Sequence, residues 1–355
     1  MSKKLLWLFA ALAATLVLVA AGCGSDDDEE GAGDTAASET STGGGAAEAI
    51  SVGLVTDIGG LNDRGFNEIA NTGLEEAESE FGVEGRVLES KSDADYIPNL
   101  STLAEEGANL IVTNGFLMGE STHQAAEQFP DTNFAIIDFA YGGEGCEETK
   151  SCELPNLQGL IFREQEVGYL AGYMAAKTSK TGTISTVGGQ KIPPVDRFIA
   201  GFQAGAKAAN PDIELLNGYS QEFVDPAPCK EIALDQLSKG SDVIFQVAGG
   251  CGLGALDAAK EKGVWGIGVD KDQAFLGDHI LTSAVKRVDV AVKSIIEAAA
   301  NGEFEGGGVS EFTLENDGVG LGETSSEVSQ EILDEIEEQK EMIIAGEIDI
   351  PDTVA

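Results

Sequence analysis

Basic side chains, histidines and aromatic rings are all scarce in this chain of 355 residues. It carries 21 Lys and Arg against 62 Asp and Glu, which gives a formal net charge of −41. A surface of that sign repels the phosphates of nucleic acids and of anionic lipid head groups, so neither is an expected partner. With only two histidines, His123 and His279, a histidine-rich metal site or a histidine proton relay has little scope.

Motifs of catalysis and metal binding are missing as well. The chain has no CxxC pair, which leaves a zinc site or thioredoxin-type chemistry without support. It has no GxSxG motif, and neither histidine stands in a recognisable nucleophile setting. We therefore expect that the protein is not an enzyme and that it holds neither a metal ion nor a cofactor.

What is present is enough apolar sequence for a core. Hydrophobic residues make up 42% of the chain, which excludes wholesale disorder, and the length allows one large domain or two smaller ones. Residues 1–22 carry a charge of +2 and residues 24–48 carry −8, so −35 remains on the rest of the chain. A solvated acidic surface accounts for most of this charge.

The first 48 residues have the features of a targeting signal followed by a tether. Residues 1–22 have the two lysines, the apolar run and the small residues of a secretory signal peptide. The segment Val19-Ala20-Ala21-Gly22-Cys23 resembles the lipobox of bacterial lipoproteins, which implies a lipid on Cys23; a cleaved signal with an incidental cysteine is the alternative. Residues 23–48 are acidic and rich in Gly, Ala, Ser and Thr, so we expect a disordered tether. The body would then be lipid-anchored at the membrane, facing outside the cytoplasm.

Export makes disulfides possible for the other four cysteines. Cys146 and Cys152 close a short polar loop and form one expected pair. Cys229 and Cys251 each follow a strand-like run, and adjacent strand ends could bring these two cysteines together.

From residue 49 onward, short apolar runs alternate with helix-like segments. The expected strands are residues 50–56, 86–89, 110–113, 134–137, 157–162, 183–187, 213–216, 243–247 and 265–269. The expected helices include residues 66–80, 96–106, 118–128, 164–179, 225–239 and 252–262. This alternation predicts an α/β fold with parallel sheets covered on both faces, and the number of units favours two lobes.

Ligands of open α/β sheets bind beyond the carboxyl ends of the strands, so the residues there are the candidates. In the loop after the first strand, Asp57 and Asn67 offer polar groups and Phe66 offers a ring face. Asn62 and Asp63 in the same loop are explained by helix capping alone. Asp138 and Asp270 each end a buried strand and need partners, either loop amides or ligand groups.

A glycine-rich turn follows the strand at residues 243–247. Gly250, Gly252 and Ala255 fit the dinucleotide pattern GxGxxG/A, and Asp270 lies 20 residues further on. The pattern stands late in the chain, and an exported protein does not meet cytosolic NAD, so dinucleotide binding is not favoured. The turn still allows backbone amides to approach a ligand.

Three blocks of sequence resemble the basic membrane protein family, the purine-nucleoside-binding lipoproteins of bacterial ABC importers. They comprise residues 52–67, residues 162–172 with Phe-Arg-Glu-Gln-Glu at their start, and residues 223–289 with Gly-Val-Asp-Lys-Asp-Gln at 268–273. The resemblance implies a type I periplasmic-binding fold: two doubly wound parallel-sheet lobes joined by a three-strand hinge near residues 159–163, 282–286 and 312–314. The implied N-terminal lobe is 49–160 plus 286–312, and the C-terminal lobe is 161–285 plus 313–355.

The resemblance also implies roles for individual residues. The base would stack on Phe66, Phe198 and Phe223, while Asp57, Asp138 and Asp270 would hold base and ribose. Asn67 and Lys286 would add polar contacts, and Gly249 would allow a close backbone approach. This sequence departs from the family pattern at Gly65, where Ser is usual, and at Cys229 and Cys251.

These observations together predict a monomeric extracytoplasmic lipoprotein that captures a purine nucleoside and delivers it to ABC permease subunits. Three acids against one lysine favour an uncharged ligand over a phosphorylated one. The alternatives are a receptor for a sugar or a signal molecule, a sensory lipoprotein without a permease, and an exported nucleoside hydrolase. The last lacks an activated nucleophile in the sequence.

Overall fold

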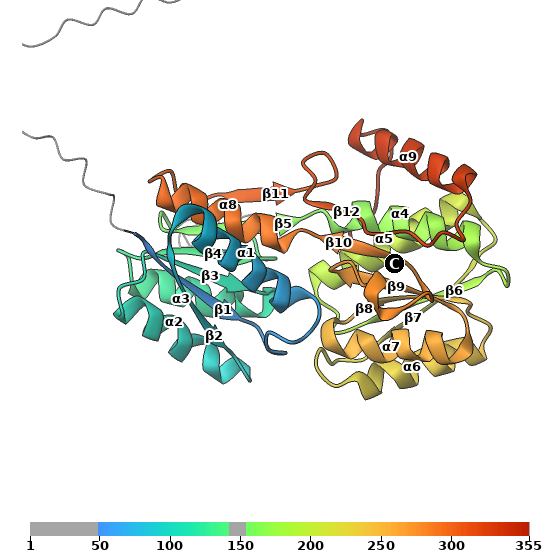
Figure 1. The fold of residues 1–355 in the computed structure, drawn as a ribbon, viewed down its shortest axis with the longest axis horizontal. Helices are drawn as coiled ribbons and strands as arrows, with labels where there is room; N and C mark the ends of the chain where they lie inside the picture. Colours follow the sequence, from blue (N-terminus) through green and yellow to red (C-terminus); the bar gives the residue numbers. More distant parts are fainter. Residues whose placement is uncertain (1–48, 142–153, 355) are drawn as a thin grey trace, which may run out of the picture. The chain divides into compact units, whose positions relative to one another are not determined.

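The computed structural model describes residues 49–141 and 154–354, which belong to one compact unit. Two six-stranded sheets, each with helices on both faces, organise these residues (Figure 1). The expected α/β class with two lobes is confirmed. The expected signal peptide, the tether, Cys23, Cys146 and Cys152 lie outside the described residues.

The first lobe is built on a sheet with strand order β11-β5-β4-β3-β1-β2. Its strands are β1 (Ser51–Thr56), β2 (Glu84–Glu89), β3 (Leu110–Asn114), β4 (Asn133–Ile137), β5 (Leu157–Phe162) and β11 (Val309–Phe312). All neighbours in this sheet are parallel. Its helices are α1 (Phe66–Phe81), α2 (Tyr96–Glu105), α3 (Gly119–Gln128) and α8 (Val288–Ala300).

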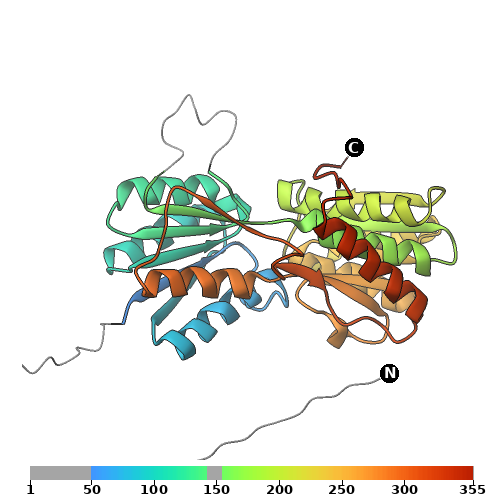
Figure 2. The same ribbon diagram turned by 90° about the horizontal axis from the view of Figure 1, so that it is seen from above.

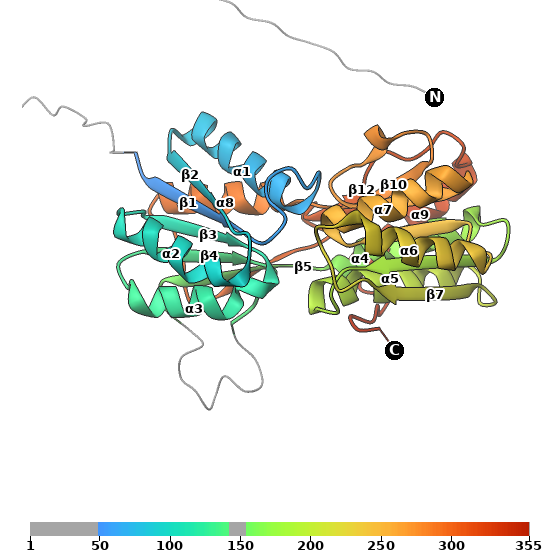
Figure 3. The same ribbon diagram turned by 90° about the horizontal axis from the view of Figure 1, so that it is seen from below.

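Alternate strand residues of the first lobe face different helix pairs. In β3, Leu110 and Val112 join the core under α1 and α8, whereas Ile111 joins the core under α2 and α3. Figure 3 shows these two helix pairs on opposite faces of the sheet. A strand buried on both faces is apolar along most of its length, which is why β1, β3 and β4 read as short, nearly continuous apolar runs, whereas the edge strands β2 and β11 are half-exposed and more polar.

The second lobe has the strand order β12-β10-β9-β8-β6-β7. Its strands are β6 (Thr183–Gly188), β7 (Glu214–Tyr219), β8 (Val243–Val247), β9 (Trp265–Asp270), β10 (Ile280–Lys286) and β12 (Val319–Leu321). Its helices are α4 (Glu164–Thr178), α5 (Pro193–Ala209), α6 (Pro226–Ser238), α7 (Gly249–Lys262) and α9 (Gln330–Ile344). In β8, Phe245 packs with the rings of α5 and Ile244 packs under α6 and α7.

The structure adds β10, α8, β11, β12 and α9 to the elements expected from the sequence, and two further details differ from that expectation. Strand β12 pairs with β10 in antiparallel fashion, so the second sheet is not purely parallel. Helix α7 begins at Gly249 rather than at residue 252, because Gly249 takes a left-handed φ of 52° and turns the chain directly out of β8. The glycine-rich turn is thus the first turn of the helix itself.

Three chain segments pass from one lobe to the other. They follow β5, β10 and β11, and Figure 2 shows them running between the two sheets. They coincide with the hinge segments expected near residues 159–163, 282–286 and 312–314. None of the helices within residues 49–141 and 154–354 is both long and apolar enough to cross a membrane.

A disulfide between Cys229 and Cys251 joins the first turns of α6 and α7, with Cα atoms 5.6 Å apart. Both cysteines are fully buried, together with Ala233 and Ala255, under these two helices. The bond fixes the start of α7, where the glycine-rich turn stands.

We predict that removing this bond destabilises the second lobe. The two cysteines are 22 residues apart, and closing a loop of that length contributes about 3 kcal/mol to stability in the chain-entropy model. Denaturant unfolding of the Cys229→Ala/Cys251→Ala protein should show a loss of that size, and reductant should cause a similar loss in the wild type. A Cys146→Ser/Cys152→Ser control should keep the sensitivity to reductant. Wild-type stability that does not change with reductant would show that the bond is absent or contributes nothing.

Candidate ligand-binding site

A pocket lies between the two lobes at the carboxyl ends of their strands. It encloses about 670 Å³ of space, a figure that includes space open to solvent. All nine residues that the sequence nominated line it: Asp57, Phe66, Asn67, Asp138, Phe198, Phe223, Gly249, Asp270 and Lys286. The fold thus brings together residues that are up to 229 positions apart in the sequence. Their role as ligand contacts remains a prediction.

The first-lobe wall is held by hydrogen bonds between loops. Asp57 accepts hydrogen bonds from the hydroxyl of Tyr96 and from the amide of Ile58, the latter at 2.7 Å. Burial raises the pKa of Asp57, and these two hydrogen bonds partly offset the rise. Asn67 accepts a 3.0 Å hydrogen bond from Asn114 at the end of β3. These contacts fix both polar side chains before any ligand arrives.

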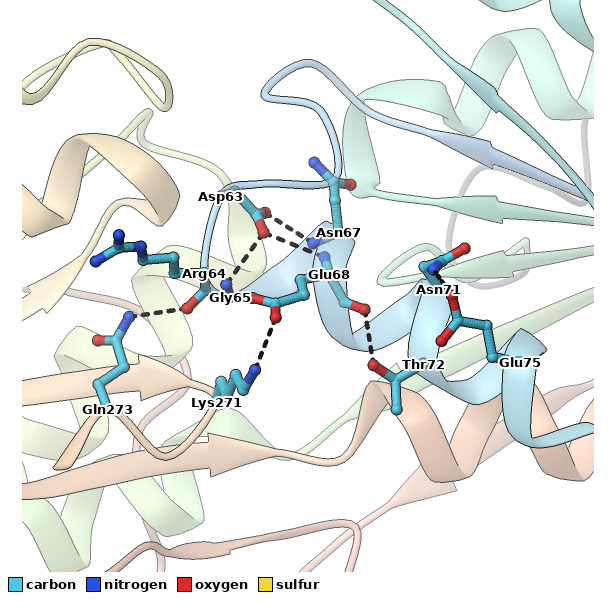
Figure 4. A network of polar contacts seen from close by, with 10 residues as sticks. All are labelled: Asp63, Arg64, Gly65, Asn67, Glu68, Asn71, Thr72, Glu75, Lys271 and Gln273. Carbon is cyan, nitrogen blue, oxygen red and sulfur yellow. Dashed lines mark hydrogen bonds and ion pairs between the residues drawn. The ribbon is translucent and has the colours of Figure 1, made fainter. Parts of the chain in front are cut away.

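Asp63 caps helix α1, as the simpler interpretation of this loop expected. Its carboxylate accepts hydrogen bonds from the amides of Gly65, Asn67 and Glu68 at 2.8–3.1 Å (Figure 4). These are amides at the start of the helix that would otherwise lack partners. Asp63 nevertheless also lines the pocket. Its capping role therefore places Phe66 and Asn67 at the first turn of α1, facing the cavity.

The ammonium group of Lys286 lies at the centre of the site and is buried. It is 2.5 Å from a carboxylate oxygen of Asp138 and 2.9 Å from one of Glu164, whose other oxygen accepts from Arg197 at 2.6 Å. Burial alone would lower the pKa of Lys286, but the carboxylates of Asp138 and Glu164 raise it, and the net shift is upward. Lys286 is therefore a fixed cation whose charge is already matched by two acids.

Aromatic rings surround this cation. The Lys286 nitrogen lies 5.2 Å from the ring centre of Phe66, 5.0 Å from that of Phe162 and 5.9 Å from that of Phe198. Such distances allow cation–π attraction, which holds the rings in place. Phe66 comes from the first lobe and Phe198 from the second, so the pocket offers ring surfaces from both lobes.

Asp138 and Asp270 occupy matching positions at the ends of β4 and β9. Both have left-handed backbones, with φ of 75° and 63°, a conformation that costs energy in non-glycine residues and recurs at functional sites. Their partners differ. Asp138 is bound by Lys286 rather than by loop amides, whereas no hydrogen bond or ion pair to the Asp270 carboxylate comes from the described residues.

Ionisation of Asp270 is therefore unfavourable in the folded protein. Burial raises the pKa of Asp270 to about 7; Lys286 opposes this rise, and the charges of Asp138 and Asp63 add to it. A buried carboxylate without a protein partner, in a cavity, is a feature expected of a ligand-binding group. We regard it as the most informative electrostatic feature of the pocket.

The second-lobe wall combines a ring with exposed backbone. The Phe223 ring packs against Gly189, where a Cβ atom would lie 2.2 Å from the ring. The carbonyl of Phe223 accepts a hydrogen bond from the amide of Cys251 at 3.0 Å, so the disulfide-linked turn also positions this ring. Gly249 and Gly250 line the pocket, whereas a side chain at Gly252 would clash with Gln246. Gly252 thus serves packing of helix on strand rather than the pocket.

Sequence reasoning missed three contributors. Phe116 lines the pocket from the loop after β3, a strand end that could have been inspected by the same rule. Glu164 and Tyr96 hold Lys286 and Asp57 from helices, and no local pattern marks them. Within the described residues, no group of three or more His, Cys, Asp or Glu side chains could hold a metal ion.

Known proteins resemble this chain over most of its length. A family model described as "ABC transporter substrate-binding protein PnrA-like" matches residues 50–354. The ABC transporter nucleoside-binding protein BmpA of Lactococcus lactis is 34% identical over 324 residues, which cover 85% of this chain and 89% of BmpA. Basic membrane protein A of Borreliella burgdorferi is 36% identical over 309 residues, covering 86% and 88%.

Solved structures give the same result at the level of the fold. An ABC transporter solute-binding protein from Aeropyrum pernix K1 matches with a TM-score of 0.77 and 29% identity, over 86% of this chain and 94% of that one. A solute-binding protein from Conexibacter woesei matches with a TM-score of 0.69 and 26% identity, over 86% and 99%. Both similarities extend across the two lobes.

We predict that Asp270→Asn stabilises the protein in a pH-dependent way. With its pKa raised to about 7, folded Asp270 keeps a proton that the unfolded chain releases near pH 4. Wild-type stability is therefore lost as pH rises from about 4 to 7, by at most about 4 kcal/mol, and then levels off. The Tm difference between variant and wild type should grow over this range and stay constant above it. A difference that does not vary with pH would contradict the raised pKa.

Proposed function

Because this chain belongs to the PnrA-like family of ABC transporter substrate-binding proteins, we propose that it captures a purine nucleoside between its lobes and delivers it to a permease. The observation that carries the proposal is the pairing of ring surfaces with buried strand-end carboxylates in one pocket. Phe66, Phe198 and Phe223 offer faces for a base, and Asp270 offers an acceptor without a protein partner among the described residues.

The charges of the pocket favour an uncharged ligand. Its one lysine, Lys286, already faces Asp138 and Glu164 at 2.9 Å or less, so it has no unmatched charge for a phosphate. Asp57 and Asp270 would repel a phosphate group in a site of low dielectric constant. Ribose hydroxyls, by contrast, donate hydrogen bonds to such carboxylates and would stabilise their ionised form.

The available non-covalent contacts suffice for tight binding, and no reaction of the ligand is required. Stacking contributes about 1–3 kcal/mol per base, and each hydrogen bond to a charged group contributes about 1.5–3 kcal/mol. Together they support a Kd in the micromolar range or below. Binding and release, rather than catalysis, is the proposed activity.

We further propose that the protein works outside the cytoplasm as a monomer anchored through a lipid on Cys23. The lipobox-like segment and the acidic stretch of residues 24–48 support this location, and substrate-binding proteins of ABC importers act on that side of the membrane. The anchor would keep the two lobes within reach of the permease.

We predict that a nucleoside binds much more tightly than its nucleotide, and that sugars do not bind. Calorimetric titration with inosine, guanosine and adenosine should give a micromolar or lower Kd for at least one of them. Inosine monophosphate should bind at least 100-fold more weakly, because its phosphate adds negative charge beside Asp57 and Asp270. If a sugar binds and no nucleoside does, the proposed ligand class is wrong. Release of free base during incubation would instead indicate a hydrolase.

We also predict that Asp270→Ala weakens nucleoside binding at least tenfold while the protein stays folded. The reason is the loss of a charge-assisted hydrogen bond from the ligand. Circular dichroism checks the fold and calorimetry gives the affinity. Asp235→Ala, which removes an exposed acid of α6 that pairs with Lys239 and does not line the pocket, is the control and should leave the affinity unchanged. Equal affinity of Asp270→Ala and wild type would exclude Asp270 from the site.

A further inference from the structure

Two direct contacts join the lobes beside the pocket. The ammonium of Lys271, just after β9, lies 2.9 Å from the carboxylate of Glu68 on α1. The side-chain amide of Gln273 donates a 3.2 Å hydrogen bond to the backbone carbonyl of Arg64 in the loop before α1. Figure 4 shows both contacts between the second-lobe strand ends and the start of α1. We call these four residues the interlobe bridge.

The two charged residues of the interlobe bridge follow pocket residues directly in the sequence. Glu68 comes after Phe66 and Asn67, and Lys271 comes after Asp270. None of the four bridge residues lines the pocket. Opening the lobes would therefore break the bridge and expose the pocket in one movement, although the bridge itself makes no ligand contact.

In the Gln273–Arg64 contact of the bridge, each partner is already held in place by its own lobe. Gln273 is 1% exposed, and its carbonyl oxygen accepts from Gln246 at 3.0 Å and from the amide of Val269 at 3.3 Å. On the other side, Arg64 has a left-handed φ of 55° in the turn that Asp63 caps. Groups that are already ordered lose little conformational entropy when they pair. The contact is thus more favourable than one between two mobile side chains.

The net charge of the two lobes makes an attractive ion pair between them more important for their contact. The described residues of the first lobe (49–141, 154–162 and 287–312) carry 22 acidic and 5 basic side chains, and those of the second lobe (163–286 and 313–354) carry 28 and 13. Both lobes are thus net acidic and repel each other when they approach. In the Lys271–Glu68 pair, a cation of one net acidic lobe meets an acid of the other. This pairing offsets part of the repulsion at the place where the lobes touch.

We propose that the interlobe bridge favours the closed arrangement of the lobes and thereby sets the rate of ligand release. A contact formed only in the closed state shifts the equilibrium toward that state, whether or not a ligand is bound. Gln273 and Lys271 are then positioning residues, which act on the ligand through lobe closure. The identity of the released ligand rests on the proposed function, whereas the effect of the bridge on lobe closure does not.

The test is a charge reversal and its rescue in the full-length protein. Lys271→Glu places two acids face to face and should speed nucleoside release, measured by stopped-flow displacement, five- to thirtyfold. The double variant Glu68→Lys/Lys271→Glu restores the ion pair with its two charges exchanged. It should return the release rate to within threefold of wild type. Raising the salt concentration should shrink the difference in release rate between Lys271→Glu and the wild type, because salt screens both the ion pair and the repulsion that replaces it.

Lys230→Glu is the matched control. Lys230 pairs with Glu261 at 2.6 Å, is exposed to a similar extent as Lys271, and joins α6 to α7 within one lobe. This change alters the net charge by the same amount but breaks no contact between lobes. It should leave the release rate within twofold of wild type. A similar acceleration in this control would attribute the effect to net charge and overturn the proposal.

Amide hydrogen exchange without ligand separates the bridge from the proposed function. In Lys271→Glu, exchange should rise in peptides that cover the pocket loops of both lobes, residues 57–67 and 247–250, with an unchanged Tm. The double variant should restore wild-type exchange. If no nucleoside binds the wild type, the proposed ligand is wrong and this exchange result still decides on the bridge. Equal exchange in these loops across all the variants would overturn the proposed effect on closure.

Discussion

The ammonium group of Lys286 is the interaction on which the rest of the site depends. It stands at the end of β10, where the chain leaves the second lobe, and it pairs with Asp138 of the first lobe and with Glu164 at the start of α4. Breaking a buried pair of this kind leaves an uncompensated charge, which typically costs 3–5 kcal/mol. One cation therefore links both sheets and a hinge segment, and the rings of Phe66 and Phe198 pack around it.

Several features of the pocket are costly for folding. Asp138 and Asp270 have left-handed backbones, and Asp270 is buried with no partner from the described residues. These costs are offset by the two cores beneath each sheet and by the disulfide at the start of α7. A ligand whose hydroxyl groups donate to Asp270 would supply the interaction that the protein itself does not provide. Strain and unmatched charge are thus concentrated where a ligand is expected.

Much of this arrangement could be predicted from the sequence, because parallel strands end on the same edge of a sheet. That rule selected Asp57, Asp138 and Asp270 from separate loops, and the resemblance to a family added Phe198 and Lys286; the fold brings all five to one pocket. The contacts between residues far apart in the sequence could not be predicted. Nothing near Glu164 or Gln273 in the sequence shows which lobe they will contact, and the antiparallel pairing of β12 has no local signature.

The central claim is that a purine nucleoside binds between the lobes with its base on the rings and its ribose on Asp270. A crystal structure of the protein grown with the tightest-binding nucleoside tests this most directly. The account predicts the base in contact with Phe66 and with Phe198 or Phe223, and a ribose hydroxyl within hydrogen-bond distance of Asp270. A nucleoside bound elsewhere, or one in this pocket whose ribose does not reach Asp270, would contradict it.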